Sequence, residues 1–578
     1  MSHMPRSFTV LFNPARWSIT TLLWSAVVLI TLASLWRFVH LDHLLVWHDE
    51  VYSIIRVLGY SIDEIFNYIF VGQLLTPEQI LRFQHFDGAH GWIDTFRALI
   101  GHPEHGPLYY LFGRLILIFP LEPVVGLRAV AALMSALLPP AVFWLMRELF
   151  GRTEKNWPVA WVAAALIAVS PLYVLFAHEA RQYTLWLLLL LVSTAAFLRA
   201  LRSQNHRWWW LYSGLMLLSF YTHLLSALTV CIHACYGLLY LYMTRVEWKQ
   251  SRTVIRSWLL AIAVATLLFT PWLAVIFHHQ QLLTSYTSWM STTVSVSMTF
   301  QAWGAHFIRA FIDFDPSLPT WLLVLLLPMA LAIGVYVRHA PRPAVWLFPL
   351  FAVCFIGVVL IPDLLFGGMR SLQMRYALPA VLAVQCMIAW TVGIALIPAT
   401  QSAIKPLLLT PARARVVFSL LIAAGIVSLV VIDHTPTWWN KNYSENNRHV
   451  ANLINAHPAS LLFISNSAGV SVGEVISIAY HLNPDVRIWA EPLTGVTADV
   501  LLPTTTGERF ALLPWTTLIA AFAPDQVTLI DGSWQWFRVE SLVSEPPLIS
   551  SAHEEPAPPD IALPTEQLPN QTPPSIAE

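Results

Sequence analysis

The chain has 578 residues, of which 57% are hydrophobic and only 11% are charged. Soluble globular proteins contain about 25% charged residues, so this composition excludes an ordinary soluble protein and is typical of one embedded in a membrane. The formal net charge of −1 gives no basis for a nucleic-acid partner, because nucleic-acid-binding proteins carry an excess of Lys and Arg.

Apolar segments of about 20 residues, the length that crosses a bilayer as a helix, recur along the chain. The first follows a basic N-terminus and has no small-residue cleavage site after it, so we interpret it as an uncleaved span. All four cysteines fall within predicted spans, which argues against a disulfide framework. Eleven spans are predicted, over residues 17–39, 126–147, 157–177, 182–201, 207–222, 224–243, 256–278, 319–338, 343–361, 376–397 and 413–432.

The segment 107–120 decides the topology, because it is short, bounded by prolines and carries Arg114 in its middle. As a twelfth span it would invert the membrane orientation of all later spans and loops. Basic residues concentrate in cytoplasmic loops, and eleven spans with a cytoplasmic N-terminus place nearly every basic cluster on that side. We therefore expect 107–120 to lie along the outer surface and the C-terminal part to be extracytoplasmic. The few cysteines favour a plasma membrane, the inner membrane of a bacterium.

Two regions outside the spans are long enough to form structure of their own. The first outer loop, residues 40–125, contains the amphipathic stretches SIDEIFNYIF and PEQILRFQHF, which suit juxtamembrane helices along the interface. It belongs to a predicted transmembrane domain over residues 1–432. Residues 433–544 are predicted to form a small extracytoplasmic α/β domain, and the Pro-rich acidic tail 545–578 is predicted to be disordered. The expected elements of the α/β domain are helices in NRHVANLINA and GEVISIAYHL, strands in LLFIS and VRIWA, and a hairpin in QVTLIDGSWQWFRV that turns at Asp531-Gly532.

Three adjacent ionisable residues, His48, Asp49 and Glu50, open the first outer loop. Trp47 precedes them, and an indole favours the membrane interface. A single acid at that level would be ordinary solvated surface. Two adjacent acids point in different directions, so we expect different partners for them, with one facing a cavity and the other anchoring the loop.

Further polar residues interrupt apolar sequence at the same predicted face. Glu179 suits a helix N-terminus, whereas Arg181 beside it gains nothing from the helix dipole. His223 separates two apolar runs, although a lone membrane histidine is more often structural. Arg370 and Arg375 lie outside against the charge rule. Arginine suits a phosphate group, and a carboxylate can take a proton from an acceptor hydroxyl or amine, so together these residues indicate a functional site.

The loop that precedes 107–120 is less specific. His102, Glu104 and His105 are residue types that can bind a metal, but they stand in a Pro/Gly loop where anchoring at the interface explains them equally well.

Four of these motifs, taken in order, resemble those of membrane-embedded GT-C glycosyltransferases of the protein O-mannosyltransferase and aminoarabinose-transferase type. The resemblance covers roughly residues 15–430, and one position departs from it, because Gly106 replaces the first Pro of a His-Pro-Pro-Leu-Tyr-Tyr stretch. The matching residues are the Asp49-Glu50 pair, HGPLYY at 105–110, Glu179, Ala180, Arg181 and Tyr183, and Arg375, Tyr376 and Pro379.

The resemblance implies a GT-C fold and transfer of a sugar, with inversion, from a polyprenyl-phosphate-linked donor in the lipid bilayer to a glycan, lipid or protein acceptor. Asp49 would be the general base, and Arg375 would stabilise the leaving phosphate. No cofactor is obligatory, and a divalent cation stays an open alternative. The full expected set is Asp49, Glu50 and Glu179 as catalytic residues, Arg375, Arg181 and Arg370 at the donor phosphate, and His48, His105, Tyr109, Tyr183, His223 and Tyr376 at the substrates.

Two other functions are alternatives to this one. A transporter or flippase for a lipid-linked sugar would also need outer arginines, but it should carry polar groups at mid-membrane and on the inner side as well. A scaffold protein has no need for Asp49, Glu179 and Arg375 together.

Overall fold

The backbone of a transmembrane segment must satisfy its own hydrogen bonds, so the apolar segments of this chain form helices. The chain divides into a helical unit, Met1–Ser61 with Gln84–Asn442, and a sheet unit, Ile62–Phe83 with Tyr443–Glu578. The predicted disordered tail and the Asp531-Gly532 turn lie outside the described residues. The computed structural model describes residues 19–153, 156–203, 205–397, 410–457, 460–465, 470–492, 509–513, 518, 526–530, 533 and 535–539.

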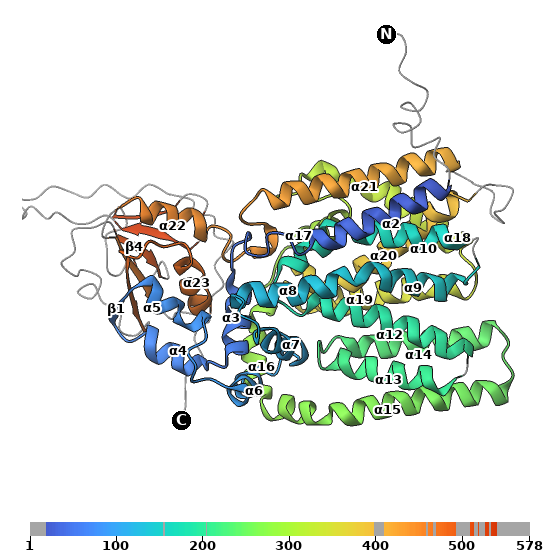
Figure 1. The fold of residues 1–578 in the computed structure, drawn as a ribbon, viewed down its shortest axis with the longest axis horizontal. Coiled ribbons are helices and arrows are strands. Elements are labelled where there is room, and N and C mark those ends of the chain that lie inside the picture. The colour runs from blue at the N-terminus through green and yellow to red at the C-terminus, as the bar shows by residue number, and fades with distance from the viewer. Residues whose placement is uncertain are drawn as a thin grey trace, which may run out of the picture. The chain divides into compact units, whose positions relative to one another are not determined.

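Each predicted span corresponds to a helix or to consecutive helices of the helical unit (Figure 1). Among the described residues, eight are long and apolar enough to cross a membrane, or nine if a pair bent by 50° between α10 and α11 counts as one span. The other two, α2 and α13, fall short of that apolar length. The helices are α2 (Ile19–Trp36), α8 (Pro123–Ala136) with α9 (Leu138–Phe150), α10 (Trp157–Ala168) with α11 (Pro171–Leu175) and η4 (Phe176–His178), α12 (Tyr183–Ser203), α13 (His206–Phe220), α14 (Ser226–Met243), α15 (Trp248–His278), η6 (Thr320–Leu325) with α18 (Leu326–His339), η7 (Ala344–Trp346) with α19 (Leu347–Phe366), α20 (Met374–Ala395) and α21 (Pro411–Asp433).

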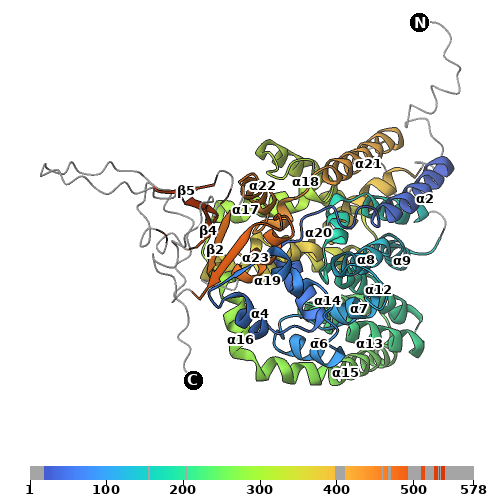
Figure 2. The same cartoon turned by 60° about the vertical axis from the view of Figure 1, so that its left-hand side comes forward.

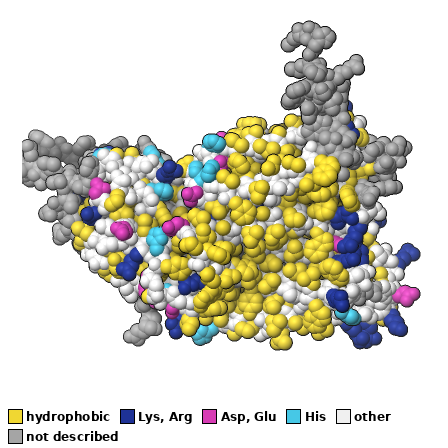
Figure 3. All heavy atoms as spheres, viewed as in Figure 1, with side chains coloured by type: hydrophobic (Ala, Val, Ile, Leu, Met, Phe, Trp, Pro, Cys, Tyr) yellow, Lys and Arg dark blue, Asp and Glu magenta, His cyan; other side chains and the backbone are white. Residues whose placement is uncertain are grey.

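The helices of this unit differ in how much protein surrounds them. α12 and α20 are almost completely buried, whereas most of the apolar surface of α15 and α18 faces outward. Figure 3 shows the resulting hydrophobic band over the helices, with Lys and Arg gathered at its right-hand end. An apolar outer surface bounded by charge is the pattern of a bundle surrounded by lipid, so the protein is an integral membrane protein.

Shorter elements connect the spans at the end of the bundle opposite to the one where Lys and Arg gather. The shortness of α7 bears on the topology, because nine residues reach only about 14 Å at about 1.5 Å per residue. A bilayer core of about 30 Å is twice as thick, so α7 does not cross it. These elements are α3 (His48–Leu58), α6 (Trp92–Ile100), α7 (Leu108–Ile116), α16 (Gln280–Thr287), η5 (Ser288–Ser291), α17 (Val296–Arg309), η8 (Arg370–Leu372) and η9 (Trp439–Lys441).

Gly106, the one departure from the motif pattern, lies in a close backbone contact. A Cβ atom at this position would clash with the backbone carbonyl oxygen of Tyr221. That same oxygen accepts a hydrogen bond from the backbone N–H of Leu108 at 3.0 Å. A residue with a side chain at 106 would push the start of α7 away from the bend between α13 and α14, so in this chain glycine is required there.

The sheet unit contains a six-stranded mixed sheet in the order β1-β3-β2-β4-β6-β5. The centre is parallel, because β2 pairs with both β3 and β4 in that direction, and the two edges are antiparallel. The predicted strands, helices and hairpin pairing are confirmed, with α22 and α23 beside the strands in Figure 2. The elements are α4 (Ile62–Ile69), β1 (Gln73–Leu75), α5 (Pro77–Leu81), η2 (Arg82–Gln84), α22 (Asn447–Asn455), β2 (Leu461–Ser465), α23 (Val470–Ala479), β3 (Arg487–Glu491), β4 (Arg509–Leu512), β5 (Val527–Leu529) and β6 (Phe537–Val539).

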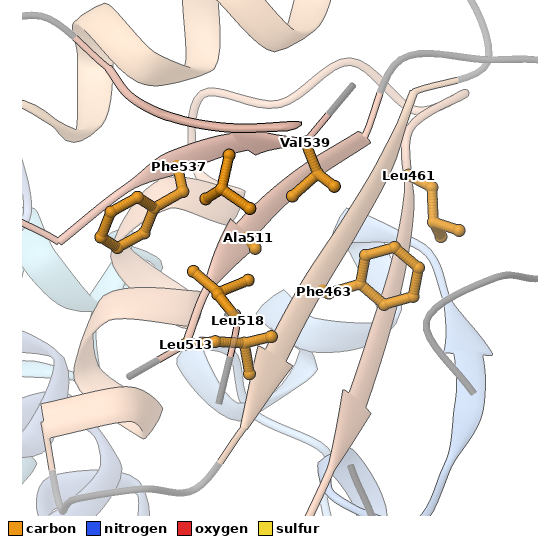
Figure 4. Packing of buried hydrophobic residues seen from close by; sticks show 8 residues of the cluster. Leu461, Phe463, Ala511, Leu513, Leu518, Phe537 and Val539 are labelled. Carbon is orange, nitrogen blue, oxygen red and sulfur yellow. The ribbon is translucent and has the colours of Figure 1, made fainter. Parts of the chain in front are cut away.

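Residues 62–83 of the first outer loop are part of this unit, which the sequence did not indicate. Strand β1 pairs with β3 at the sheet edge, with Leu74 opposite Trp489. The apolar residues of α4 and α5 that suited a membrane interface are covered by protein instead, since Ile65, Ile69 and Ile80 are fully buried. On the other side of the sheet, Figure 4 shows Phe463, Phe537 and their neighbours packed into a hydrophobic core.

Candidate functional site

Helix α3 opens the site and presents the two adjacent acids. It begins at His48 directly after Trp47, and Asp49 and Glu50 occupy its first turn, where negative charge is favoured by the helix dipole. It ends at Leu58, and the capping residue Gly59 that follows has a φ of +95°, in the left-handed region that favours glycine. As expected from their adjacent positions, the two carboxylates have different partners.

Glu50 is completely buried in a network of ion pairs. The guanidinium of Arg128 donates to both carboxylate oxygens, at 2.8 and 2.7 Å, and the ammonium of Lys441 donates at 2.6 Å. The backbone N–H of Ala180 adds a fourth bond at 2.7 Å. Arg128 and Lys441 are themselves fully buried. This carboxylate therefore fixes α3 to α8 and to the segments around residues 180 and 441.

Lys441 belongs to a four-residue segment, Trp438–Lys441, that reaches three buried acids. The indole N–H groups of Trp438 and Trp439 both donate to one oxygen of Asp313, at 3.0 and 2.7 Å. Asn440 donates to Glu179 at 2.8 Å, and Lys441 to Glu50. The chain that follows the last span is thereby anchored to the polar end of the helical unit.

Asp49 lies on a different side of α3, where it meets two arginines from other helices. Its carboxylate accepts a hydrogen bond from Arg375, in the first turn of α20, and lies 3.5 Å from the guanidinium of Arg181, just before α12. Arg181 also donates to the backbone carbonyl of Asp49 at 3.3 Å. The Asp49 side chain remains 17% exposed, while Arg181 and Arg375 are 4% and 12% exposed. This carboxylate, unlike that of Glu50, is accessible from outside.

Aromatic side chains surround the two arginines. Arg181 lies over the ring of Tyr183 at 5.7 Å, and Arg375 lies over the ring of Tyr376 at 5.7 Å. His223, in the bend between α13 and α14, stacks on Trp186 at 4.2 Å with its ring 6.4 Å from that of Tyr376. The starts of α12 and α20 and this bend thus meet around Asp49.

The charges of the site shift the pKa values of its acids in opposite directions. Burial alone would raise the pKa of Asp49, but Arg181 and Arg375 outweigh it and hold that pKa well below its usual range. Arg128 and Lys441 do the same for Glu50 and lower its pKa to about 2. For Glu179 burial dominates and raises the pKa to about 7, in spite of the opposing charge of Lys441. Asp49 and Glu50 are thus ionised at neutral pH, and Glu179 titrates there.

Four of the expected site residues have partners elsewhere. Arg370, in η8, pairs with Asp363 of α19 at 2.9 Å. Tyr109 donates its hydroxyl to the carbonyl of Leu127 at 2.8 Å and is fully buried. The ring of His48 lies 5.1 Å from that of Tyr52, and Nε2 of His105 lies 3.5 Å from a carboxylate oxygen of Glu104.

Sequence reasoning missed several residues of the network. Arg128 is a cation near the outer end of an apolar span, and a charge in such a place must be paired. Its position in the sequence could therefore have identified it as part of the network. Arg56 stands seven residues after Asp49, two turns along the same face of α3. Asn440 and Lys441 had no comparable signal, because they follow the last span in a polar connection.

The acids of the site do not form a suitable set of metal ligands. Asp49 and Glu50 are each paired with two cationic side chains. Within the described ranges, no group of three or more His, Cys, Asp or Glu side chains has the arrangement of a metal site. Cations already neutralise these carboxylates, so we derive no step through a metal ion.

Comparison with known proteins finds similarity at the level of structure only. No family model and no curated sequence matches the chain. ArnT from Cupriavidus metallidurans in the apo state matches at a TM-score of 0.50 with 13% identity, covering 89% of this chain and 97% of that protein. ArnT bound to undecaprenyl phosphate matches at a TM-score of 0.48 with 12% identity and the same coverage, 89% and 97%.

A second protein is similar over less of its length. The archaeal oligosaccharyltransferase AglB from Archaeoglobus fulgidus, solved in complex with an inhibitory peptide and a dolichol-phosphate, matches at a TM-score of 0.40 with 14% identity, covering 81% of this chain and 64% of that one. The fold is the one that the motifs led us to expect. It is the GT-C fold of a polytopic membrane protein, shared with ArnT over most of both chains.

Proposed function

We propose that this protein is a glycosyltransferase that moves a sugar from a polyprenyl-phosphate-linked donor to an acceptor on the extracytoplasmic face. The observation that carries the proposal is the accessible carboxylate of Asp49, held by Arg375 and Arg181. Two arginines suit a phosphate group, and a carboxylate beside them suits proton removal from an acceptor. The fold shared with ArnT supports the same class of enzyme, and ArnT has been solved with undecaprenyl phosphate.

In the proposed reaction one bond forms as another breaks. An acceptor oxygen or nitrogen attacks the anomeric carbon of the donor sugar while Asp49 takes its proton. The bond from that carbon to the phosphate oxygen breaks, and polyprenyl phosphate leaves as a dianion that Arg375 and Arg181 stabilise. A single displacement inverts the configuration at the anomeric carbon.

The ion pairs of Asp49 bear on its role as a base. A carboxylate whose pKa is held low by two arginines is a weak base. The donor phosphate would compete with Asp49 for the same N–H groups, and the Nε atoms of Arg181 and Arg375 have no hydrogen-bond partner among the described residues. Binding of the donor would therefore draw the guanidinium groups toward the phosphate and raise the pKa of Asp49. In this proposal the base becomes effective only when the leaving group is in place.

Glu50 and Glu179 have positioning roles in this proposal. The carboxylate of Glu50 is fully occupied and has no access to a substrate, so it holds Asp49 in place through α3. Glu179 stands two residues before Arg181, and it is buried and accepts a hydrogen bond from Asn440. It therefore fixes the loop that carries that arginine.

The proposed orientation places the site on the outer side of a bacterial inner membrane. The helix ends and connections at the opposite end of the bundle carry Arg152, Arg202, Arg245 and Lys249. Basic connections favour the cytoplasmic side, which supports an outer location for Asp49.

The experiment that tests the function follows labelled sugar from the donor. Purified protein in detergent is given polyprenyl phosphate carrying radiolabelled mannose, glucose or aminoarabinose, with a membrane extract as the source of acceptors. Wild type should transfer label, Asp49→Asn should not, and Glu122→Gln, which changes an acid that is 70% exposed, should behave as wild type. Labelled lipid that crosses liposome membranes without loss of its sugar would contradict the proposal and support a transporter.

A further inference from the structure

Arg56 is a buried cation that the proposed chemistry does not use. It lies on α3 seven residues after Asp49, and its side chain is only 7% exposed. Its nearest acidic partner is Glu104, with 3.9 Å between Nη2 and Oε1. Within the part of the chain that the structure describes, Nε and Nη1 are buried and have no hydrogen-bond partner. Two buried guanidinium nitrogens without hydrogen bonds are costly, so their presence calls for a reason.

Glu104 is incompletely paired in the same way. Its Oε1 atom lies 3.4 Å from His102 and 3.5 Å from His105, on the same side as Arg56. Its Oε2 atom is buried and has no hydrogen-bond partner among the described residues. Unsatisfied donors and an unsatisfied acceptor therefore lie side by side, which is what a ligand carrying several hydroxyl groups would complete.

This pair lies close to the proposed reaction centre. The charge of Arg56 contributes, after those of Arg181, Arg375 and His48, to the lowered pKa of Asp49. Burial lowers the pKa of His105 well below its usual value, and the charges of Arg56 and Arg181 lower it further. Burial lowers the pKa of His102 as well. With both histidines neutral, Arg56 and Glu104 are the two charges of this cluster, and these cancel.

We propose that Arg56 and Glu104 bind hydroxyl groups of the sugar that is transferred, and that this sugar is neutral. The guanidinium would donate to hydroxyl oxygens, and Oε2 of Glu104 would accept a hydroxyl proton. An amino sugar would bring a second cation to Arg56, and a uronic acid would bring a second anion to Glu104. The inference rests on the proposed function, because it assumes that a sugar donor binds beside Asp49.

The alternative for Arg56 is a third arginine on the donor phosphate. The carboxylate of Glu104 at 3.9 Å argues against it, since a phosphate dianion at Arg56 would be repelled by this acid. The two roles predict different losses. A phosphate ligand affects every polyprenyl phosphate, whereas a sugar ligand affects only those that carry a sugar.

The test measures binding without an acceptor, which excludes effects on the acceptor site. Wild type, Arg56→Gln, Glu104→Gln and the control Arg97→Gln, which changes a side chain that is 75% exposed, are titrated with four lipids. These are polyprenyl phosphate alone and polyprenyl phosphate carrying mannose, glucose or 4-amino-arabinose. We expect Arg56→Gln and Glu104→Gln to weaken binding of the mannose or glucose lipid by roughly ten- to a hundred-fold, because hydrogen bonds to charged groups are lost. Binding of polyprenyl phosphate alone should be unchanged, which also shows that the variants are folded.

Any other result of these titrations would contradict a specific part of the proposal. If Arg56→Gln weakens binding of polyprenyl phosphate alone as much as binding of the sugar-carrying lipids, Arg56 is a phosphate ligand. If wild type binds the amino sugar lipid more tightly than both neutral sugar lipids, the proposal that the transferred sugar is neutral is wrong. Wild type titrated with deoxy-mannose and deoxy-glucose donors gives a check that needs no variant, since no loss for any missing hydroxyl refutes the hydroxyl contacts. If wild type fails to bind polyprenyl phosphate at all, the proposed function itself is wrong.

Discussion

The adjacent acids Asp49 and Glu50 should respond in opposite ways to the same loss of charge. Glu50→Gln would leave Arg128 and Lys441, both fully buried, without the carboxylate that accepts three hydrogen bonds from them. Breaking a buried ion pair from one side costs about 3–5 kcal/mol, because the remaining charge is left without water or a partner. We expect this variant to unfold at a clearly lower temperature and to lose activity in step with its folded fraction.

Asp49→Asn should leave the fold nearly intact and abolish turnover. The asparagine keeps an oxygen that can accept from Arg375, and the site is open enough for water to reach it, so we expect a stability loss of about 1 kcal/mol. Activity should fall at least about 100-fold, the usual contribution of a positioned base. The neighbouring residues thus separate a loss of chemistry from a loss of fold.

The assay is thermal unfolding in detergent followed by tryptophan fluorescence, beside turnover at a temperature where wild type is folded. The 26 tryptophans of the chain give a strong signal. Glu122→Gln serves as the control for removal of an exposed acid. An unchanged melting temperature for Glu50→Gln would refute the account of the buried network, and near-normal turnover by Asp49→Asn would remove Asp49 from the mechanism.

Three further predictions test other parts of the argument. Arg375→Lys keeps the charge but loses the two-pronged guanidinium, so we expect at least about ten-fold lower turnover in the label-transfer assay; full activity would argue against a phosphate contact. Because burial raises the pKa of Glu179 to about 7, the folded state binds its proton more tightly than the unfolded state, and stability should fall as pH rises from about 4.5 to about 7. Glu179→Gln should reduce that slope in melting temperatures measured across the range, and an unchanged slope would contradict the assignment. A reporter fused after Asp433 should appear on the outer side and one fused after Arg245 on the inner side, and the reverse result would invert the orientation.

The transmembrane helices and most residues of the candidate site could be predicted from the sequence alone. Hydrophobicity over about 20 residues is a local property, so the spans could be read directly from composition. The convergence of Asp49, Arg181 and Arg375 followed from motifs that all fall at one predicted membrane face. The strands at 461–465 and 487–491 were equally visible, because short apolar runs bounded by turn residues are strong strand signals.

The pairing of the charges depends on the folded structure. Glu50 pairs with Arg128 and with Lys441, 391 positions away, and residues 73–75 complete a sheet formed mainly by the C-terminal part. Whether an acid is accessible or enclosed depends on packing between segments that are distant in sequence. Asp49 and Glu50 are neighbours in the chain, yet a turn of 100° about the helix axis places one toward the proposed substrates and the other in a closed ion network.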